Sequence, residues 1–235
     1  MRLVSLVPSV TESVLAWGVT PIACTRFCEQ PSLPHVGGTK DPDVAAIVAL
    51  APDLVVMCDE ENRREDADAL TAAGLQLHVT HVVSLADVQP MADALAAAVG
   101  VTPPVLDTGP GLGVEPATWR AAFVPIWRRP WMTINGDTYG SSLLAHLGIA
   151  NVFASSPDRY PVVDIDDVRA RRPDLVLLPT EPYSFRPAHV AELRGQLPDT
   201  TIVTLDGQDL FWWGTRTPAA VERLRAALRA APTPR

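Results

Sequence analysis

The chain has 235 residues, of which 47% are hydrophobic and 20% are charged. This length is sufficient for one large domain or two small ones, and either can bury a substantial core. A formal net charge of −8 argues against nucleic acid and anionic membrane surfaces as partners. Because the apolar runs are much shorter than the roughly 18 residues that a spanning helix needs, no membrane insertion is expected.

The N-terminal segment is predicted to be a strand and not a signal peptide. Leu3–Val7 is apolar, but Ser9, Thr11 and Glu12 interrupt the apolar pattern soon afterwards. The three cysteines are odd in number and lack the spacing of a disulfide framework, which suits a reducing compartment. The sequence as written therefore predicts a cytoplasmic protein, or a periplasmic or extracellular one if the natural start lies upstream.

The first part of the chain alternates strands with helices, which is typical of a mostly parallel sheet. The predicted strands are Leu3–Val7, Pro21–Thr25, Leu54–Met57 and Leu75–Thr80. Three polar residues precede the intervening helices and are expected to cap them: Ser9, Asp41 and Asn62. A further helix is predicted over Asp87–Val99, where Gly100 ends it.

The middle of the chain is rich in breakers. Val101–Pro116 carries many proline and glycine residues and is predicted to connect two lobes. Ala117–Ile126 has no clear pattern and is assigned no element.

The second part repeats the alternation. Strands are predicted at Trp131–Asn135, Ala150–Ala154, Leu175–Leu178 and Thr201–Leu205, and a closing helix at Pro218–Ala230. Asp137 is expected to cap a helix that ends at Leu147–Gly148, and Asp164 to cap a short helix before the third strand.

One stretch occurs twice. Pro52–Leu70 is echoed by Pro173–Leu193, and the same offset of 121 residues separates Asp53 from Asp174 and Glu60 from Glu181. A repeat of about half the chain indicates two similar α/β lobes. We therefore expect a lobe over residues 1–86, a connecting helix and linker over 87–118, and a second lobe over 119–235.

The predicted strand ends indicate a binding protein. In open α/β sheets ligands bind at the carboxyl ends of strands, and all three tyrosines together with Phe185, Phe211, Trp212 and Trp213 fall in such loops. Aromatic walls suit a large, partly apolar ligand. The alternative is that these aromatic side chains pack between the lobes.

No motif for catalysis or metal binding stands out, so neither a catalytic residue nor a metal site is predicted. Cys24, Cys28 and His35 do not have a zinc-site spacing. Ser9 lacks a G-x-S-x-G context, and Gly37–Lys40 lacks the phosphate-loop spacing.

Several motifs together resemble a known family. They are LVSLVPSVTESVLAWG, VGGTKDP, ALAPDLVVMCDEENRREDADAL, PWMTINGDTYGSSLLAHLGIANVFA, RYPVVDIDD, PDLVLLPTEPYSF and LDGQDLFWWGTR. They resemble the cobalamin-binding proteins of bacterial importers and their helical backbone metal receptor relatives, which are class III periplasmic-binding-protein-like members of the TroA-like superfamily. The resemblance covers nearly the whole chain apart from about residues 100–118.

The resemblance implies a fold of two α/β lobes with mostly parallel sheets, joined by a helical spine, with the ligand in a cleft between them. It implies no intrinsic cofactor, and a bound cobalamin or other metal chelate as ligand. The implied ligand-binding residues are Ser9, Thr11, Phe27, Cys28, Gly38, Thr39, Lys40, Asp137, Thr138, Tyr139, Arg159, Tyr160, Tyr183, Trp212 and Trp213. The implied docking residues for an ABC importer or another protein partner are Glu61, Glu65 and Glu181.

The sequence therefore predicts a binding protein for a corrinoid or related metal chelate, not an enzyme. One alternative is a siderophore- or haem-binding relative. Another is a cytoplasmic enzyme that uses Glu60, Asp137 or Glu181 as acid or base. A third is an interaction module that regulates a partner through its acidic loops.

Overall fold

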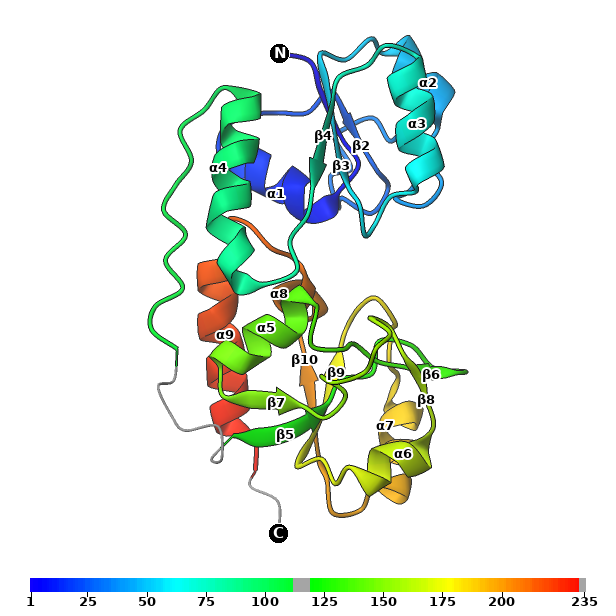
Figure 1. The fold of residues 1–235 in the computed structure, drawn as a ribbon, viewed down its shortest axis with the longest axis vertical. Helices are drawn as coiled ribbons and strands as arrows, with labels where there is room; N and C mark the ends of the chain where they lie inside the picture. The colour runs from blue at the N-terminus through cyan, green and yellow to red at the C-terminus, as the bar shows by residue number, and fades with distance from the viewer. Residues whose placement is uncertain (112–118, 233–235) are drawn as a thin grey trace. The chain divides into compact units, whose positions relative to one another are not determined.

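The computed structural model describes residues 1–111 and 119–232, which form two compact α/β units (Figure 1). The first unit comprises Met1–Val82, Ala86–Leu106 and Trp213–Arg216. The second comprises Val83–Leu85 and the described parts of Asp107–Trp212 and Thr217–Arg235. Part of the expected linker, residues 112–116, lies outside the described residues, as do the first two residues of Ala117–Ile126.

The first unit has a four-stranded parallel sheet in the order β2-β1-β3-β4. Its elements are β1 (Leu3–Ser5), α1 (Pro8–Ala16), β2 (Ala23–Cys24), α2 (Val44–Ala49), β3 (Leu54–Cys58), α3 (Arg64–Ala72), β4 (Leu77–Thr80) and α4 (Val88–Val99). A short 3₁₀ turn, η1 (Leu85–Asp87), precedes α4.

Alternating strand residues build the core of the first unit. Val4, Val55 and Met57 of β1 and β3 pack with Ile47 of α2 and Leu70 of α3, and all five side chains are buried. The helices α1 and α4 lie on the other side of the sheet (Figure 1), where they contact β1 and β4.

The second unit also has a four-stranded parallel sheet, in the order β10-β9-β5-β7. Its elements are β5 (Arg120–Phe123), β6 (Trp131–Met132), α5 (Tyr139–His146), β7 (Ile149–Asn151), β8 (Val162–Val163), α6 (Ile165–Ala170), β9 (Leu175–Pro179), α7 (Pro187–Gln196), β10 (Thr201–Leu205), α8 (Gly207–Phe211) and α9 (Thr217–Ala230).

The core of the second unit follows the same plan. Phe123, Val176 and Leu178 of β5 and β9 pack with Val168 of α6 and Leu193 of α7. The helices α5, α8 and α9 contact one another and the strands β7 and β10. The two copies of the sequence repeat supply β3 and β9, which lie in different sheets, so the prediction of two similar α/β units is confirmed.

One predicted strand is wrong. Trp131–Asn135 was expected to be a strand of the second sheet, but only Trp131–Met132 is extended, and it pairs antiparallel with β8. The sheet strand at this point is β5, from the region that was assigned no element. Asn135 is instead held in a turn, where its side-chain oxygen accepts a hydrogen bond from the Asp137 N–H.

Several predicted helix caps are also wrong. The helix α1 begins at Pro8, one residue before Ser9, and proline needs no cap for its own nitrogen. The next two helices follow Asp43 and Arg63, not Asp41 and Asn62.

In the second unit Thr138, not Asp137, caps α5 by accepting from the Ser141 N–H. The predicted cap Asp164 is confirmed, because its carboxylate accepts from the backbone N–H groups of Asp166 and Asp167. The predicted helix end at Gly100 is confirmed as well, with a φ of 77°.

Candidate functional site

Asn62 holds together three loops at the carboxyl edge of the first sheet. Its Oδ1 accepts from the Cys58 N–H at 2.8 Å, and its Nδ2 donates to the Thr39 carbonyl at 2.8 Å and the Leu6 carbonyl at 3.4 Å. The side chain is buried, so each lost hydrogen bond leaves a polar group without water. Asn62 therefore fixes the loops after β1 and β3 relative to the Gly37–Lys40 loop.

Thr11 and Cys28 meet in the interior of the first unit. Thr11 Oγ1 lies 3.2 Å from Cys28 Sγ, 2.8 Å from Ser5 Oγ and 3.0 Å from the Val7 carbonyl oxygen. Ser9 is also buried, and its hydroxyl has no hydrogen-bond partner among residues 1–111 and 119–232. Of the predicted ligand residues here, Ser9 and Thr11 lie in the first turn of α1 and Phe27 and Cys28 in the loop after β2, and only Phe27 is well exposed, at 50%.

The Gly37–Lys40 loop is tied to the acidic loop after β3. Lys40 Nζ donates to the Glu60 carbonyl at 2.6 Å. Gly38 is buried against the Asp41 and Arg26 side chains, and both would have to shift to make room for a side chain at this position. Nearby at the same strand ends, His81 Nδ1 lies 2.7 Å from a carboxylate oxygen of Asp59.

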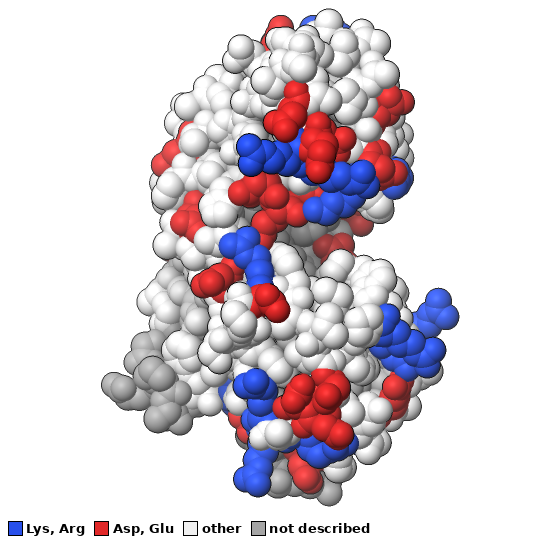
Figure 2. Space-filling model, turned by 45° about the vertical axis from the view of Figure 1, so that its right-hand side comes forward, with Lys and Arg blue, Asp and Glu red and all other residues white. Residues whose placement is uncertain are grey.

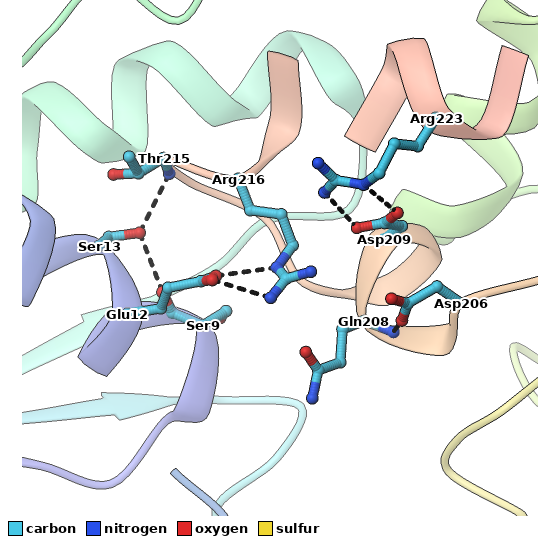
Figure 3. Close-up of polar contacts among 9 residues, drawn as sticks. All are labelled: Ser9, Glu12, Ser13, Asp206, Gln208, Asp209, Thr215, Arg216 and Arg223. Carbon is cyan, nitrogen blue, oxygen red and sulfur yellow. Dashed lines mark hydrogen bonds and ion pairs between the residues drawn. The ribbon is translucent and has the colours of Figure 1, made fainter. Parts of the chain in front are cut away.

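The segment Trp213–Arg216 packs on α1 within the first unit (Figure 3). The Arg216 guanidinium donates to both carboxylate oxygens of Glu12, at 2.9 and 2.8 Å. The Thr215 N–H donates to Ser13 Oγ at 3.1 Å, and that hydroxyl donates to the Ser9 carbonyl at 2.9 Å. Trp213 is only 5% exposed, so this predicted ligand residue anchors the segment in the unit.

The second unit carries an aromatic cluster at the carboxyl ends of β5 and β9, two adjacent parallel strands. The Trp127 and Tyr183 rings meet edge to face at 5.1 Å, and Tyr183 lies 4.8 Å from Phe185. Phe185 stacks on Trp131 at 6.1 Å, and His189 lies 5.8 Å from Tyr183. We call these five residues the aromatic cluster. Trp127 is 45% exposed, so the cluster offers an aromatic ring to solvent.

The start of α5 is held by buried polar side chains. Asn135 Nδ2 donates to the Ser156 carbonyl at 3.0 Å, and Thr138 Oγ1 donates to the Asn135 carbonyl at 3.1 Å. Tyr139 is buried, its hydroxyl lies 3.1 Å from Thr217 Oγ1, and burial raises the pKa of Tyr139 to about 12. Of the predicted ligand residues at this helix start, only Asp137 is exposed.

The remaining predicted residues occupy varied positions. Tyr160 is 42% exposed, and Arg159 and Trp212 are partly buried. Trp212 ends α8, which an ion pair fixes to α9: the Arg223 guanidinium contacts the buried Asp209 carboxylate at 2.7 and 2.6 Å (Figure 3). Among the predicted docking acids, Glu65 is exposed in the first turn of α3, and Glu61 and Glu181 are partly buried.

The cysteines of the first unit are buried free thiols. Burial, with a smaller effect of neighbouring Cys28, raises the pKa of Cys24 to about 12. Burial and the charge of Glu61 raise the pKa of Cys58 to about 11. In the part of the chain that the structure describes, no three His, Cys, Asp or Glu side chains are grouped so as to hold a metal ion.

The sequence of this chain is similar to those of known binding proteins. No established family profile matches the chain. It is 26% identical over 190 residues to the vitamin B12-binding protein of Salmonella choleraesuis, an alignment that spans 75% of this chain and 71% of the relative. The corresponding protein of Photorhabdus laumondii is 24% identical over 193 residues, 76% of this chain and 70% of the relative.

The fold agrees with solved structures. The periplasmic vitamin B12 binding protein BtuF of Vibrio cholerae matches with a TM-score of 0.75 at 21% identity, over 97% of this chain and 96% of that one. The chain therefore has the fold of this periplasmic binding protein. Another structure of this fold, the periplasmic heme-binding protein BhuT in complex with two hemes, has a TM-score of 0.77 at 19% identity, over 97% and 98% of the two chains.

The similarity to known binding proteins bears on the alternative functions that the sequence left open. The relatives named above are binding proteins, which favours that class over an enzyme with Glu60, Asp137 or Glu181 as acid or base. The two structures are described as periplasmic, so the expectation of a cytoplasmic protein is not supported. Among the described residues no helix is both long and apolar enough to cross a membrane.

Two residues of the site were missed at the level of sequence. Trp127 lies directly after Ala117–Ile126, the segment without a clear pattern, and its signal is an aromatic residue four positions after the end of β5. Asn62 was interpreted as a helix cap. Its three partners come from loops far apart in the sequence, and no local pattern indicates them.

Proposed function

We propose that this protein is a substrate-binding protein that captures a corrinoid or a related metal chelate. Relatives at 24–26% identity are named vitamin B12-binding proteins, and a protein of the same fold is named for heme. These ligands share a broad, flat, largely apolar ring around a metal. The metal in such a ligand is part of the cargo.

The observation that carries the proposal is the aromatic cluster at the carboxyl edge of the second sheet. Burial of a flat ring against aromatic side chains contributes about 25 cal/mol for each Å² removed from water. Trp127 is 45% exposed while its ring still packs on Tyr183, so the cluster presents a preformed surface. A preformed surface avoids the cost of ordering side chains on binding.

We propose candidate ligand contacts for each unit taken by itself. In the first unit these are Phe27 and the Gly38–Lys40 loop, and in the second Tyr160, Tyr183 and Trp212. Buried residues such as Thr11, Cys28 and Tyr139 then act by fixing the loops that carry the exposed ones.

Replacing Trp127 tests the proposal. We expect Trp127→Ala to weaken binding of cyanocobalamin or hemin by some tenfold to hundredfold, because one aromatic wall is lost. Trp17→Phe is the control, since Trp17 closes α1 at the end away from the carboxyl edge of the first sheet. Equal affinities for Trp127→Ala and the unaltered protein would show that the aromatic cluster is not part of the binding site.

We also propose that a protein partner, such as an importer, recognises the acidic residues Glu61, Glu65 and Glu181. Glu65 is exposed on α3, and an exposed carboxylate mainly affects association with a charged partner. Glu65→Gln should leave ligand affinity unchanged and slow delivery of the ligand to that partner. Loss of ligand affinity in this variant would contradict the assignment.

A further inference from the structure

Arginine residues are sequence neighbours of the aromatic cluster in two of its segments. Arg128 and Arg129 lie between Trp127 and Trp131, in a tight reversal where the Met132 N–H donates to the Trp127 carbonyl at 3.2 Å. Arg186 follows Phe185, and its backbone N–H donates to His189 Nδ1 at 3.0 Å. Both Arg129 and Arg186 are exposed. The segments that carry the aromatic rings therefore also carry cations at their edge.

The charges of these arginines are compensated unequally. Arg128 forms an ion pair with Glu192, and its guanidinium lies 5.8 Å from the centre of the Trp131 ring. Within residues 1–111 and 119–232, no ion pair to Arg129 or Arg186 is found. Figure 2 shows basic side chains gathered on one edge of the second unit. On a chain with a net charge of −8, two uncompensated cations beside an aromatic surface are a local exception.

We propose that the ligand of the aromatic cluster is an acidic chelate, whose ring packs on Trp127 and Tyr183 and whose peripheral carboxylates bind Arg129 and Arg186. This inference rests on the proposed function and narrows its ligand class. A guanidinium presents a planar fork of donors that matches a carboxylate, and such charge-assisted hydrogen bonds are stronger than neutral ones. A ring whose carboxyl groups are all amidated offers no anion to these two cations.

Two corrinoids provide a matched pair of probes. Cobyrinic acid carries free carboxylates around the corrin ring, whereas cobinamide has the same ring with those groups amidated. Isothermal titration of the unaltered protein with each probe, in about 50 and 500 mM NaCl, separates ring packing from charge. The variants are Arg129→Gln, Arg186→Gln and the double variant. Arg229→Gln is the control, because it removes the same charge from an exposed position in the last turn of α9.

We expect cobyrinic acid to bind at least tenfold more tightly than cobinamide at low salt, and this preference to shrink at high salt. Each single variant should weaken binding of the acid by about threefold to tenfold and leave binding of cobinamide unchanged. Arg229→Gln should change neither affinity. Because both arginines are exposed, circular dichroism of the variants should match that of the unaltered protein.

Three other outcomes overturn the inference in distinguishable ways. If both corrinoids bind equally well, the ligand class is wrong while the proposed function stands. If the double variant keeps the preference for the acid, Arg129 and Arg186 are not the recognising groups. If neither corrinoid binds and hemin does not bind either, the proposed function itself is wrong.

Discussion

Replacing Asn62 by aspartate separates two interpretations of this residue. The carboxylate keeps an acceptor for the Cys58 N–H but has no donor for the carbonyls of Thr39 and Leu6. Two hydrogen bonds of about 0.5–1.5 kcal/mol each are then lost, which lowers the free energy of unfolding by roughly 1–3 kcal/mol. The new charge also faces two carbonyl oxygens in a buried position, which adds to the loss.

The interpretation of Asn62 as a helix cap predicts the opposite. Asparagine and aspartate are about equally good caps, and a negative charge near a helix N-terminus is favourable. A residue that only capped α3 would therefore tolerate Asn62→Asp, or gain from it. The two interpretations differ in the sign of the effect, so a single variant distinguishes them.

Thermal unfolding followed by circular dichroism measures the effect. For a chain of this size about 1 kcal/mol corresponds to a shift of 2–4 °C in Tm, so Asn62→Asp should unfold roughly 2–12 °C lower. Gln76→Glu is the control, because it makes the same amide-to-acid change at an exposed side chain of the first unit. A Tm equal to or above that of the unaltered protein would refute the role of Asn62 as a tie between loops.

Three further predictions concern stability and titration. Arg223→Gln should lower the free energy of unfolding by roughly 1–3 kcal/mol, measured in urea, because a half-exposed cation is removed from the buried Asp209 carboxylate. At pH 8 a thiol reagent should react slowly with Cys24 and Cys58 in the folded protein and rapidly in urea, because their raised pKa values of about 12 and 11 keep them protonated. Burial lowers the pKa of His78 below 6.5, because the folded protein favours the neutral imidazole. The free energy of unfolding therefore keeps the full contribution of His78 above pH 6.5 and loses it as the pH falls through the lowered pKa.

A specific experimental result would contradict each of these three predictions. An unchanged urea midpoint for Arg223→Gln would mean that the ion pair does not hold α8 to α9. Fast reaction of all thiols in the folded protein would contradict their burial. For His78, the fall in stability between pH 7.5 and 5.5 should be smaller in His78→Gln, and an identical fall would contradict the role of its titration.

The strands of the repeat were predictable because their signal is local. Leu54–Met57 and Leu175–Leu178 are short runs of apolar residues after a Pro-Asp turn, and such runs indicate buried parallel strands wherever they occur. The helix ends at Gly100 and Gly148 were predictable for the same reason, since both glycines adopt the left-handed conformation.

The helix caps were less predictable because several polar residues precede each helix. Asp41 and Asp43 are both plausible caps of α2, and the structure selects Asp43, whose carboxylate accepts from the Ala46 N–H. Asp137 and Thr138 compete in the same way before α5, and Thr138 caps it. The difference in free energy between neighbouring caps is small, so tertiary contacts decide which one is used.

The aromatic cluster depends on long-range packing and was only partly predictable. Tyr183 is predicted at a strand end, but its partner Trp127 lies in a stretch for which no element or site residue is predicted. The two residues meet because β5 and β9 are neighbours in the sheet, although they lie far apart in the sequence. The position of Tyr183 after a predicted strand was therefore predictable from the sequence, whereas its contact with Trp127 depends on the order of the strands in the sheet.

The central claim is that this protein binds a flat metal chelate, and isothermal titration of the unaltered protein tests it most directly. Cyanocobalamin, cobyrinic acid and hemin should be titrated separately into purified protein. We predict saturable binding of at least one of the three, with a Kd of about 1 μM or tighter, which corresponds to roughly −8 kcal/mol. Absence of a saturable signal for all three at ligand concentrations up to about 100 μM, a hundredfold above that Kd, would contradict the claim.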